Sequence, residues 1–187
     1  MIVDYGKHLL MFKIVWWGPA MSGKSTSVRY LFEKYNKLEN LKSIETGAGR
    51  TLFFDYGDLT FIKGNWNIKI NIWTCTGQNF YAETRPTVLN GADGLIFIAD
   101  AQRNLLNDNI ESWNELKNLL GNKITEIPII FCLNKVDLNG NNKLLTISEL
   151  KQHFKLNKNA IIFETVAING RNVFESFVSL LNKIQRG

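Results

Sequence analysis

One octapeptide restricts the possible folds of this chain more than any other feature. Residues 18–25 read Gly-Pro-Ala-Met-Ser-Gly-Lys-Ser and match the spacing G-x-x-x-x-G-K-[ST]. The apolar run at residues 12–17 before it predicts a buried strand, and residues 26–35 after it carry apolar side chains at helical spacing. A strand, a glycine-rich loop and a helix in this order predict a sheet covered by helices.

The chemistry of such a loop is phosphate binding. Its glycines let successive backbone N–H groups turn toward one point, and the helix behind them adds the positive end of its dipole. A lysine at the end of the loop would neutralise the outer phosphates of a nucleotide. The competing interpretation is a chance glycine turn before a helix. The expected nucleotide contacts in this segment are Gly18, Ala20, Met21, Ser22, Gly23, Lys24, Ser25 and Thr26.

The composition is that of an ordinary globular domain. The 187 residues are 45 % hydrophobic and 21 % charged, and we expect a single domain over residues 1–187. The formal net charge of +5 could attract nucleic acid, but basic residues are interspersed with acidic ones, so we predict no nucleic-acid binding. Cys75 and Cys132 lie in strand-like apolar surroundings and predict buried thiols.

The chain carries no sign of membrane attachment. No apolar run approaches the ~20 residues needed to span a bilayer, and the N-terminus lacks the features of a signal peptide. The chain starts Met-Ile and ends Ile-Gln-Arg-Gly, which fits neither common lipid-anchor pattern. These features predict a soluble cytoplasmic protein without a direct membrane anchor. Recruitment to a membrane or a cell pole would then need a partner.

Short apolar strands alternate with amphipathic helices along the chain. We expect strands at residues 12–17, 51–63, 67–74, 94–99, 127–133 and 160–164. We expect helices at residues 26–35, 80–89, 106–120, 148–154 and 173–184, and a loop at residues 36–49. The second and third strands flank Gly64-Asn65-Trp66 and predict an antiparallel hairpin. This order predicts an α/β three-layer sandwich with a mostly parallel six-stranded sheet and one antiparallel strand.

A second motif follows the expected strand at residues 127–133. Asn134-Lys135-Val136-Asp137 matches the pattern N-K-x-D. The Asp137 carboxylate could accept from the N1–H and the exocyclic amine of guanine, which adenine cannot satisfy, so the motif predicts a preference for guanine. A polar turn at the end of a strand is the competing interpretation. The position of the motif after a phosphate loop favours the guanine site.

Together these motifs resemble the Ras-like small GTPases over nearly the whole chain. Three further blocks, at residues 50–55, 74–81 and 93–100, resemble the MglA family of prokaryotic polarity and motility GTPases. The resemblance implies a P-loop small G domain that alternates between GTP-bound and GDP-bound states. It also implies hydrolysis of GTP to GDP and phosphate, an activating partner of the roadblock/LC7 fold (MglB-like), and effectors that the sequence does not identify.

The resemblance assigns roles in a first switch at residues 40–54. Ser25 and Thr51 would hold a magnesium ion, and Thr51 would reach it only when a γ-phosphate orders the preceding loop. Arg50 would neutralise charge on the transferred phosphoryl group. The competing interpretation of Arg50 is a surface arginine in a loop.

A second switch is expected at residues 77–86. Gly77 would donate its backbone N–H to the γ-phosphate, and Gln78 would orient the attacking water, although it could also be a solvated loop residue. Val166 and Ala167 resemble the last guanine-contacting motif, in which Ala167 would offer its backbone N–H to the base. A small residue at a strand end is an equally weighted interpretation of Ala167.

Two positions depart from the Ras pattern. Thr74 stands where the D-x-x-G motif has aspartate, as it does in MglA-like proteins, and this removes a carboxylate from the surroundings of the magnesium ion. We expect Asp55 or another nearby acid to replace it in part. Ala20 stands where Ras proteins have glycine, and its methyl group could crowd Gln78 or an entering arginine, which predicts slow intrinsic turnover.

Two other functions stay open from the sequence. An Arf-like or signal-receptor β-like GTPase would share these motifs, but it is expected to bring an N-terminal amphipathic helix or a membrane span. A guanine-nucleotide-dependent scaffold that does not hydrolyse GTP would bind the nucleotide only as structural support. Gln78 and Arg50 argue against the scaffold.

Overall fold

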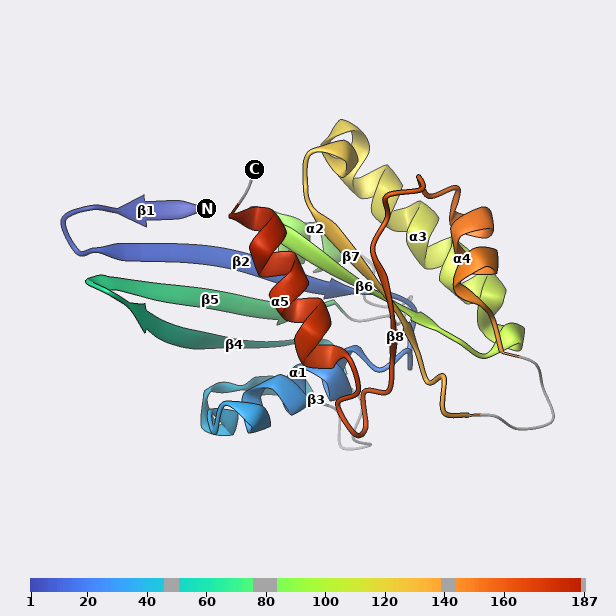
Figure 1. Ribbon diagram of the computed structural model, residues 1–187, viewed down its shortest axis with the longest axis horizontal. Helices are drawn as coiled ribbons and strands as arrows, with labels where there is room; N and C mark the ends of the chain where they lie inside the picture. Colours follow the sequence, from blue (N-terminus) through green and yellow to red (C-terminus); the bar gives the residue numbers. More distant parts are fainter. Residues whose placement is uncertain (46–50, 76–83, 139–143, 186–187) are drawn as a thin grey trace.

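The computed structural model describes residues 1–45, 51–75, 84–138 and 144–185 (Figure 1). The strands are β1 (Ile2–Asp4), β2 (Leu9–Trp17), β3 (Lys42–Glu45), β4 (Thr51–Lys63), β5 (Trp66–Thr74), β6 (Gly94–Asp100), β7 (Ile129–Asn134) and β8 (Ile162–Thr165). The α-helices are α1 (Lys24–Lys34), α2 (Arg85–Leu89), α3 (Leu106–Leu120), α4 (Ile147–Phe154) and α5 (Val173–Ile184). Short 3₁₀ helices are η1 (Leu38–Asn40), η3 (Arg103–Leu105) and η4 (Gly121–Thr125).

The strands form one sheet of eight strands in the order β3-β4-β5-β2-β6-β7-β8, with β1 beside the first half of β2. The neighbouring pairs from β5 through β2, β6 and β7 to β8 are parallel, while β1 and β4 run against the strands beside them. The predicted class, an α/β fold with a mostly parallel sheet, is therefore confirmed.

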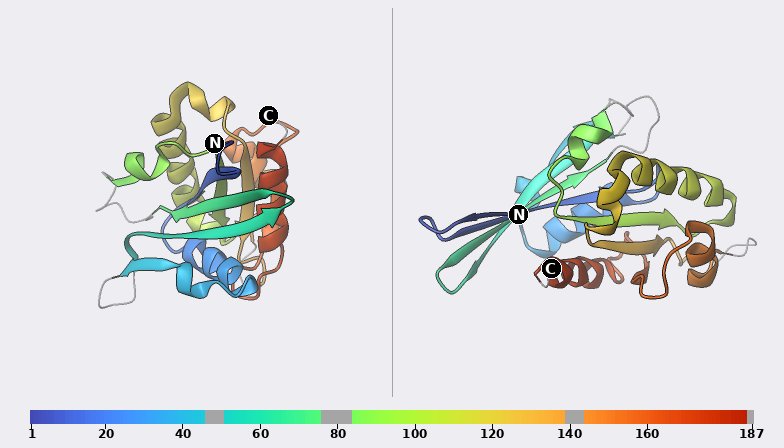
Figure 2. Two further views of the ribbon diagram at one scale, coloured as in Figure 1. Left: turned by 90° about the vertical axis from the view of Figure 1, so that its left-hand side faces the viewer. Right: turned by 90° about the horizontal axis from the view of Figure 1, so that it is seen from above.

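Each face of the sheet has its own apolar core, which gives the predicted three layers. On one face, Ile14 and Trp16 of β2 pack with residues of α1 and α5. On the other face, Val15 and Trp17 pack with residues of α2, α3 and α4. Figure 2 shows α3 and α5 on opposite sides of the sheet. The alternation of side chains along β2 thus supplies both cores.

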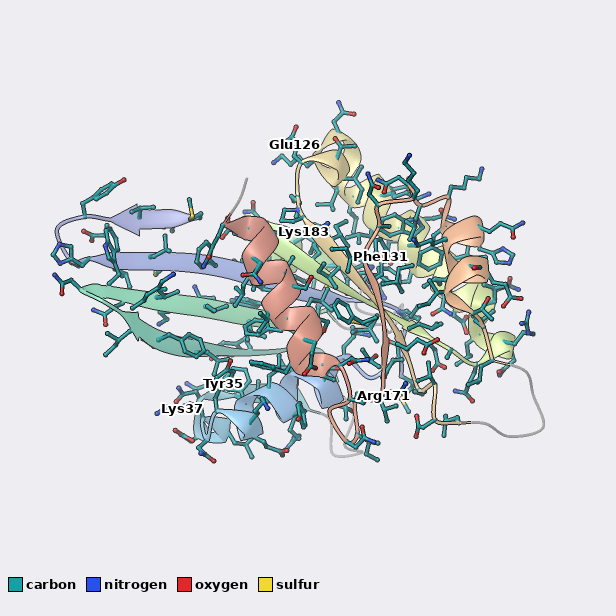
Figure 3. All side chains as sticks on the ribbon, in the orientation of Figure 1. Tyr35, Lys37, Glu126, Phe131, Arg171 and Lys183 are labelled. Carbon is teal, nitrogen blue, oxygen red and sulfur yellow. The ribbon has the colours of Figure 1, made fainter. Side chains whose placement is uncertain are left out.

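The second core is centred on four aromatic side chains. Phe97 and Phe131, from neighbouring strands, each make edge-to-face contacts with both Trp113 and Phe154. The rings of Trp113 and Phe154 are stacked, with their centres 5.6 Å apart. Figure 3 places Phe131 in the interior, beside α3 and α4. Such pairs add stability beyond the area they bury, and they fix α3 and α4 against the strands that carry the site.

The two cysteines are buried and unpaired, as predicted. Burial raises the pKa of both Cys75 and Cys132 to about 12, so neither thiol ionises readily near neutral pH. They act as small core residues.

All six predicted strands are present, and the sheet gains two more. The loop predicted at residues 36–49 contains β3, whose sequence Lys-Ser-Ile-Glu is mostly polar because it lies at the sheet edge. β2 begins at Leu9, earlier than predicted, because the three residues of β1 pair with its first part. The hairpin turn is one residue shorter than expected, since Lys63 pairs with Trp66.

The helix predicted at residues 80–89 is described only from Arg85, since residues 76–83 lie outside the described part of the chain. Pro86 lies in the first turn of α2, where a proline costs no backbone hydrogen bond. Pro86 thus belongs to the start of a helix and does not interrupt one. No helix in the described ranges is both long and apolar enough to cross a bilayer.

A glycine sets the distance between α1 and the sheet. A Cβ on Gly57 of β4 would lie 2.7 Å from the ring of Phe32 and 2.7 Å from the carbonyl oxygen of Asn40. Phe32 is fully buried on α1, so its ring rests directly on the backbone of β4. No larger residue fits at position 57 without moving the helix or the strand.

Candidate guanine-nucleotide site

The predicted motifs meet at one edge of the sheet. The strands β2, β6, β7 and β8 are parallel neighbours, so their carboxyl ends lie side by side. The phosphate loop follows β2, Asn134 ends β7, and Ala167 follows β8 closely. This is the edge at which open α/β sheets bind ligands.

Two glycines of the phosphate loop have backbone conformations that other residues avoid. Gly18 has φ 146° and Gly23 has φ 101°. A Cβ on Gly18 would lie 2.1 Å from the carbonyl oxygen of Ile98, and one on Gly23 would lie 2.3 Å from Nδ2 of Asn134. Both conformation and close packing therefore require glycine.

Gly23 is the N-cap residue of α1, and no side chain of the described residues forms a capping hydrogen bond at this helix end. The Ser22 hydroxyl is buried and has no hydrogen-bond partner among the described residues. Ala20, Met21 and Thr26 are exposed around this point. An uncapped helix N-terminus with an unpaired hydroxyl beside it suits an anion.

Lys24 is the first residue of α1, and its side chain reaches back to the backbone of the loop. Its side chain is buried and donates to the carbonyl oxygens of Gly18 at 2.9 Å and Pro19 at 2.6 Å. Burial lowers the pKa of Lys24 to about 8, and the positive charges of Arg85 and Lys135 act in the same direction. Asp55 acts on this pKa in the opposite direction, but no carboxylate of the described residues forms an ion pair with the ammonium, and the phosphates of a nucleotide would supply a direct counter-charge.

Asn134 joins three segments of the site. Its Nδ2 donates to the carbonyl oxygen of Ser22 at 2.8 Å, and its Oδ1 accepts from Thr165 Oγ1 at 3.1 Å and from the backbone N–H of Ala167 at 3.0 Å. The side chain is buried, so the loss of these bonds would leave unsatisfied polar groups. The N–H of Ala167 predicted to reach the base thus has an acceptor within the protein.

Lys135 is held by a carboxylate that the sequence analysis did not assign to the site. Its backbone has φ 66°, and its Nζ lies 2.6 Å from Oδ2 of the buried Asp100, at the end of β6. Asn109 clamps the Asp100 backbone through hydrogen bonds of 2.8 and 2.9 Å. The sequence holds only one hint of this role, because Asp100 is the carboxylate that directly follows the apolar run at residues 94–99. Asp137, two residues on, is exposed at the turn.

Thr74 contacts the acid proposed to compensate for it. Its hydroxyl donates to Oδ2 of Asp55 at 2.9 Å, and it accepts from the Asp55 backbone N–H at 2.8 Å. Both residues are buried. A carboxylate therefore lies next to the position where the D-x-x-G motif would have placed one.

Other predicted residues are placed in part or not at all. Ser25 lies half-buried in the first turn of α1, and Val166 is buried after β8. Thr51 begins β4, but its side chain is not among those described. Arg50, Gly77 and Gln78 lie outside the described residues.

A buried lysine under a glycine loop, joined by Asn134 to an Asn-Lys-x-Asp turn, defines the site of a P-loop protein that binds guanine nucleotides. A family model described as the Ras family matches residues 13–186, nearly the whole chain. The chain therefore belongs to the Ras family. It is a GTPase that binds GTP and hydrolyses it.

Relatives support a more specific likeness. The mutual gliding-motility protein MglA of Myxococcus xanthus is 31 % identical over 196 residues, covering 99 % of this chain and 98 % of the relative. The Ras-related protein Rab-4A of Homo sapiens is 25 % identical over 181 residues, covering 95 % of this chain and 78 % of the relative. The putative Ras-related protein Rab-5B of Dictyostelium discoideum is 26 % identical, covering 89 % and 83 %. The predicted resemblance to MglA-like small GTPases is confirmed.

The pKa of Lys24 predicts that nucleotide binding takes up a proton. Because this pKa is about 8 and bound phosphates would raise it, GDP binding at pH 8 should take up about half a proton, and affinity should fall as pH rises above 8. Titration calorimetry at pH 8 in two buffers of different ionisation enthalpy measures the uptake. A Lys24→Met protein is the control and should lose it. A wild-type binding enthalpy that does not depend on the buffer would contradict the prediction.

Proposed function

We propose that this protein is a molecular switch, a single G domain over residues 1–187 whose surface depends on whether GTP or GDP is bound. The observation that carries the proposal is the hydrogen bond from Asn134 to the carbonyl oxygen of Ser22. It fixes the guanine motif to the phosphate loop, so one nucleotide can bridge both. Hydrolysis then changes only the end of the nucleotide that faces the two switch segments, residues 40–54 and 77–86.

The proposed nucleotide contacts divide between phosphates and base. The backbone of residues 18–26, with Lys24, would bind the phosphates, because this segment forms an uncapped helix start over a buried ammonium. Asp137 would read the guanine edge, and Lys135 would lie against the nucleoside in the position that Asp100 sets. Ala167 would contact the base by turning its N–H away from Asn134.

We assign the catalytic roles to two side chains. Gln78 would orient the attacking water while the backbone of Gly77 binds the γ-phosphate. Arg50 would neutralise charge on the phosphoryl group in the transition state. The methyl group of Ala20, exposed at the loop, would keep the unassisted rate low.

A Gln78→Ala protein should hydrolyse bound GTP roughly 10²-fold more slowly than the wild type, because the water is no longer aligned. Its affinity for GDP should be unchanged, since Gln78 would act only on the γ-phosphate side. Single-turnover hydrolysis of preloaded GTP measures the first quantity, and fluorescent-nucleotide titration measures the second. Gln152→Ala, on α4, is the matched control and should behave as wild type. Equal rates in the Gln78→Ala and wild-type proteins would favour the scaffold interpretation.

A magnesium ion fits the oxygen donors at this site. The hydroxyls of Ser25 and Thr51 would hold it, and the Asp55 carboxylate, bonded to Thr74 at 2.9 Å, is the acid proposed to support the ion through its water shell. The ion would neutralise charge on the phosphates. Asp55 and Thr74 together would thus replace the missing aspartate.

Replacing Asp55 by asparagine should weaken magnesium binding while keeping the shape of the side chain. We expect that about 10–100-fold more magnesium will be needed to suppress nucleotide release, because mutation of residues that support a metal ligand typically weakens metal binding by this factor. The release rate of a fluorescent GDP analogue over a magnesium titration measures this. Asp58→Asn, on the same strand and paired with Lys69 at 3.6 Å, provides the control. If both variants titrate like the wild type, another acid supports the ion.

We further propose that a roadblock-type, MglB-like partner accelerates hydrolysis. The support is the likeness to MglA across 99 % of the chain. A partner that contacts the switch segments would bind the GTP form more tightly, because only that form orders them. Pull-downs on GTP-loaded and GDP-loaded protein from the source cells should recover a roadblock-fold protein mainly with GTP. Equal recovery on both forms would count against the switch, although not against nucleotide binding.

A further inference from the structure

A buried arginine joins α2 to the strand that carries the phosphate loop. Arg85 is the first residue of α2, and only 5 % of it is exposed. Its guanidinium forms an ion pair with Glu115 of α3, and its Cζ atom lies 6.0 Å from the centre of the Trp17 ring. The Trp17 indole N–H donates to the carbonyl oxygen of Ser112 at 3.0 Å. Three elements, β2, α2 and α3, therefore meet at this guanidinium.

Stability alone gives little reason for this arrangement. A buried ion pair often contributes no more to folding than apolar side chains of the same volume, because both charges lose their hydration. The positive charge also lies at a helix N-terminus, the end that disfavours cations. The apolar residues Val88 and Leu89 already bury α2 in the second core. A charged pair at position 85 is thus better explained by its directional contacts.

The surroundings of Arg85 connect it to the reaction. Trp17, over whose ring the guanidinium lies, directly precedes Gly18 of the phosphate loop. Arg85 is also close enough to Lys24 for its charge to help burial lower the pKa of that ammonium. Arg85 also lies seven residues after Gln78, and it is the last charged residue of the second switch.

We propose that the Arg85–Glu115 ion pair is a positioning contact, which holds the C-terminal end of the second switch against Trp17 and α3. The bidentate-capable guanidinium fixes both the position and the direction of the first turn of α2. The second switch, which carries Gln78, therefore has its C-terminal end attached at a fixed point beside the phosphate loop. This inference rests on the proposed catalytic role of Gln78. It predicts that GTP hydrolysis depends on Glu115 and that nucleotide binding does not.

The test is a double-mutant cycle on hydrolysis and binding. Glu115→Gln keeps the shape of the side chain and removes its charge, and Arg85→Gln removes the other half of the pair. Each should lower the single-turnover rate of GTP hydrolysis by about tenfold. The double variant should be no slower than the slower single variant, because the two residues act as one unit. The dissociation constant for GDP should change by less than about twofold in all three proteins.

The control is a second ion pair on the same face of the sheet, between η3 and α4. Arg103 and Glu149 form a more exposed pair at 2.8 Å, and Glu149→Gln should leave hydrolysis unchanged. Glu115→Asp, which restores the charge on a shorter chain, should recover part of the lost rate. Thermal unfolding of every variant separates positioning from stability.

Three results would overturn the inference alone, and a fourth would overturn it together with the proposed role of Gln78. The first is a wild-type rate in Glu115→Gln while Gln78→Ala is slow, which leaves the proposed function intact. The second is a slower hydrolysis rate in Glu149→Gln as well, with the rates of both variants falling in proportion to their melting temperatures. The loss in Glu115→Gln would then reflect stability and not positioning. The third is additive losses in the double variant. If Gln78→Ala itself hydrolyses GTP at the wild-type rate, the proposed role of Gln78 fails first and the inference fails with it.

Discussion

The site depends on one buried amide. The Asn134 side chain binds the phosphate loop through Ser22 and the segment after β8 through Thr165 and Ala167. These segments are far apart in the sequence, and the sheet and this amide together set their spacing. An aspartate at the position could not donate to the Ser22 carbonyl, so only an amide serves both sides. The distance between phosphate and base recognition is therefore built into the protein.

Charges at the site occur with partners, and this pattern explains how the protein departs from the common Ras sequence. Lys135 is paired with Asp100, and Arg85 with Glu115. Thr74 replaces an aspartate, yet the Asp55 carboxylate lies against its hydroxyl. A carboxylate on the neighbouring strand therefore lies close to the position at which the motif would place one. Lys24 differs, because its acceptors among the described residues are two carbonyl oxygens, and we propose that a nucleotide provides the balancing charge.

The features predicted correctly from the sequence are those encoded by adjacent residues. The octapeptide at residues 18–25 and the turn at Asn134 are each recognisable from consecutive residues, and apolar runs located the buried strands. The edge strand β3 was missed because its polar sequence gains its structure only by pairing with β4. Asp100 and Glu115 were missed because their partners are 35 and 30 residues away, so no local pattern reveals them. The contact between Asp55 and Thr74 could be anticipated only because the D-x-x-G motif marks position 74 as one that normally holds a carboxylate.

The contact between Gly57 and Phe32 has a mechanical consequence. β4 leads out of the segment proposed as the first switch, and α1 begins in the phosphate loop. Where the two cross, aromatic carbon meets peptide backbone with no spare volume. A displacement of β4 along its neighbours would bring a residue with a side chain beneath that ring, and α1 would have to shift to make room for it. The register of the strand is thereby coupled to the position of the helix.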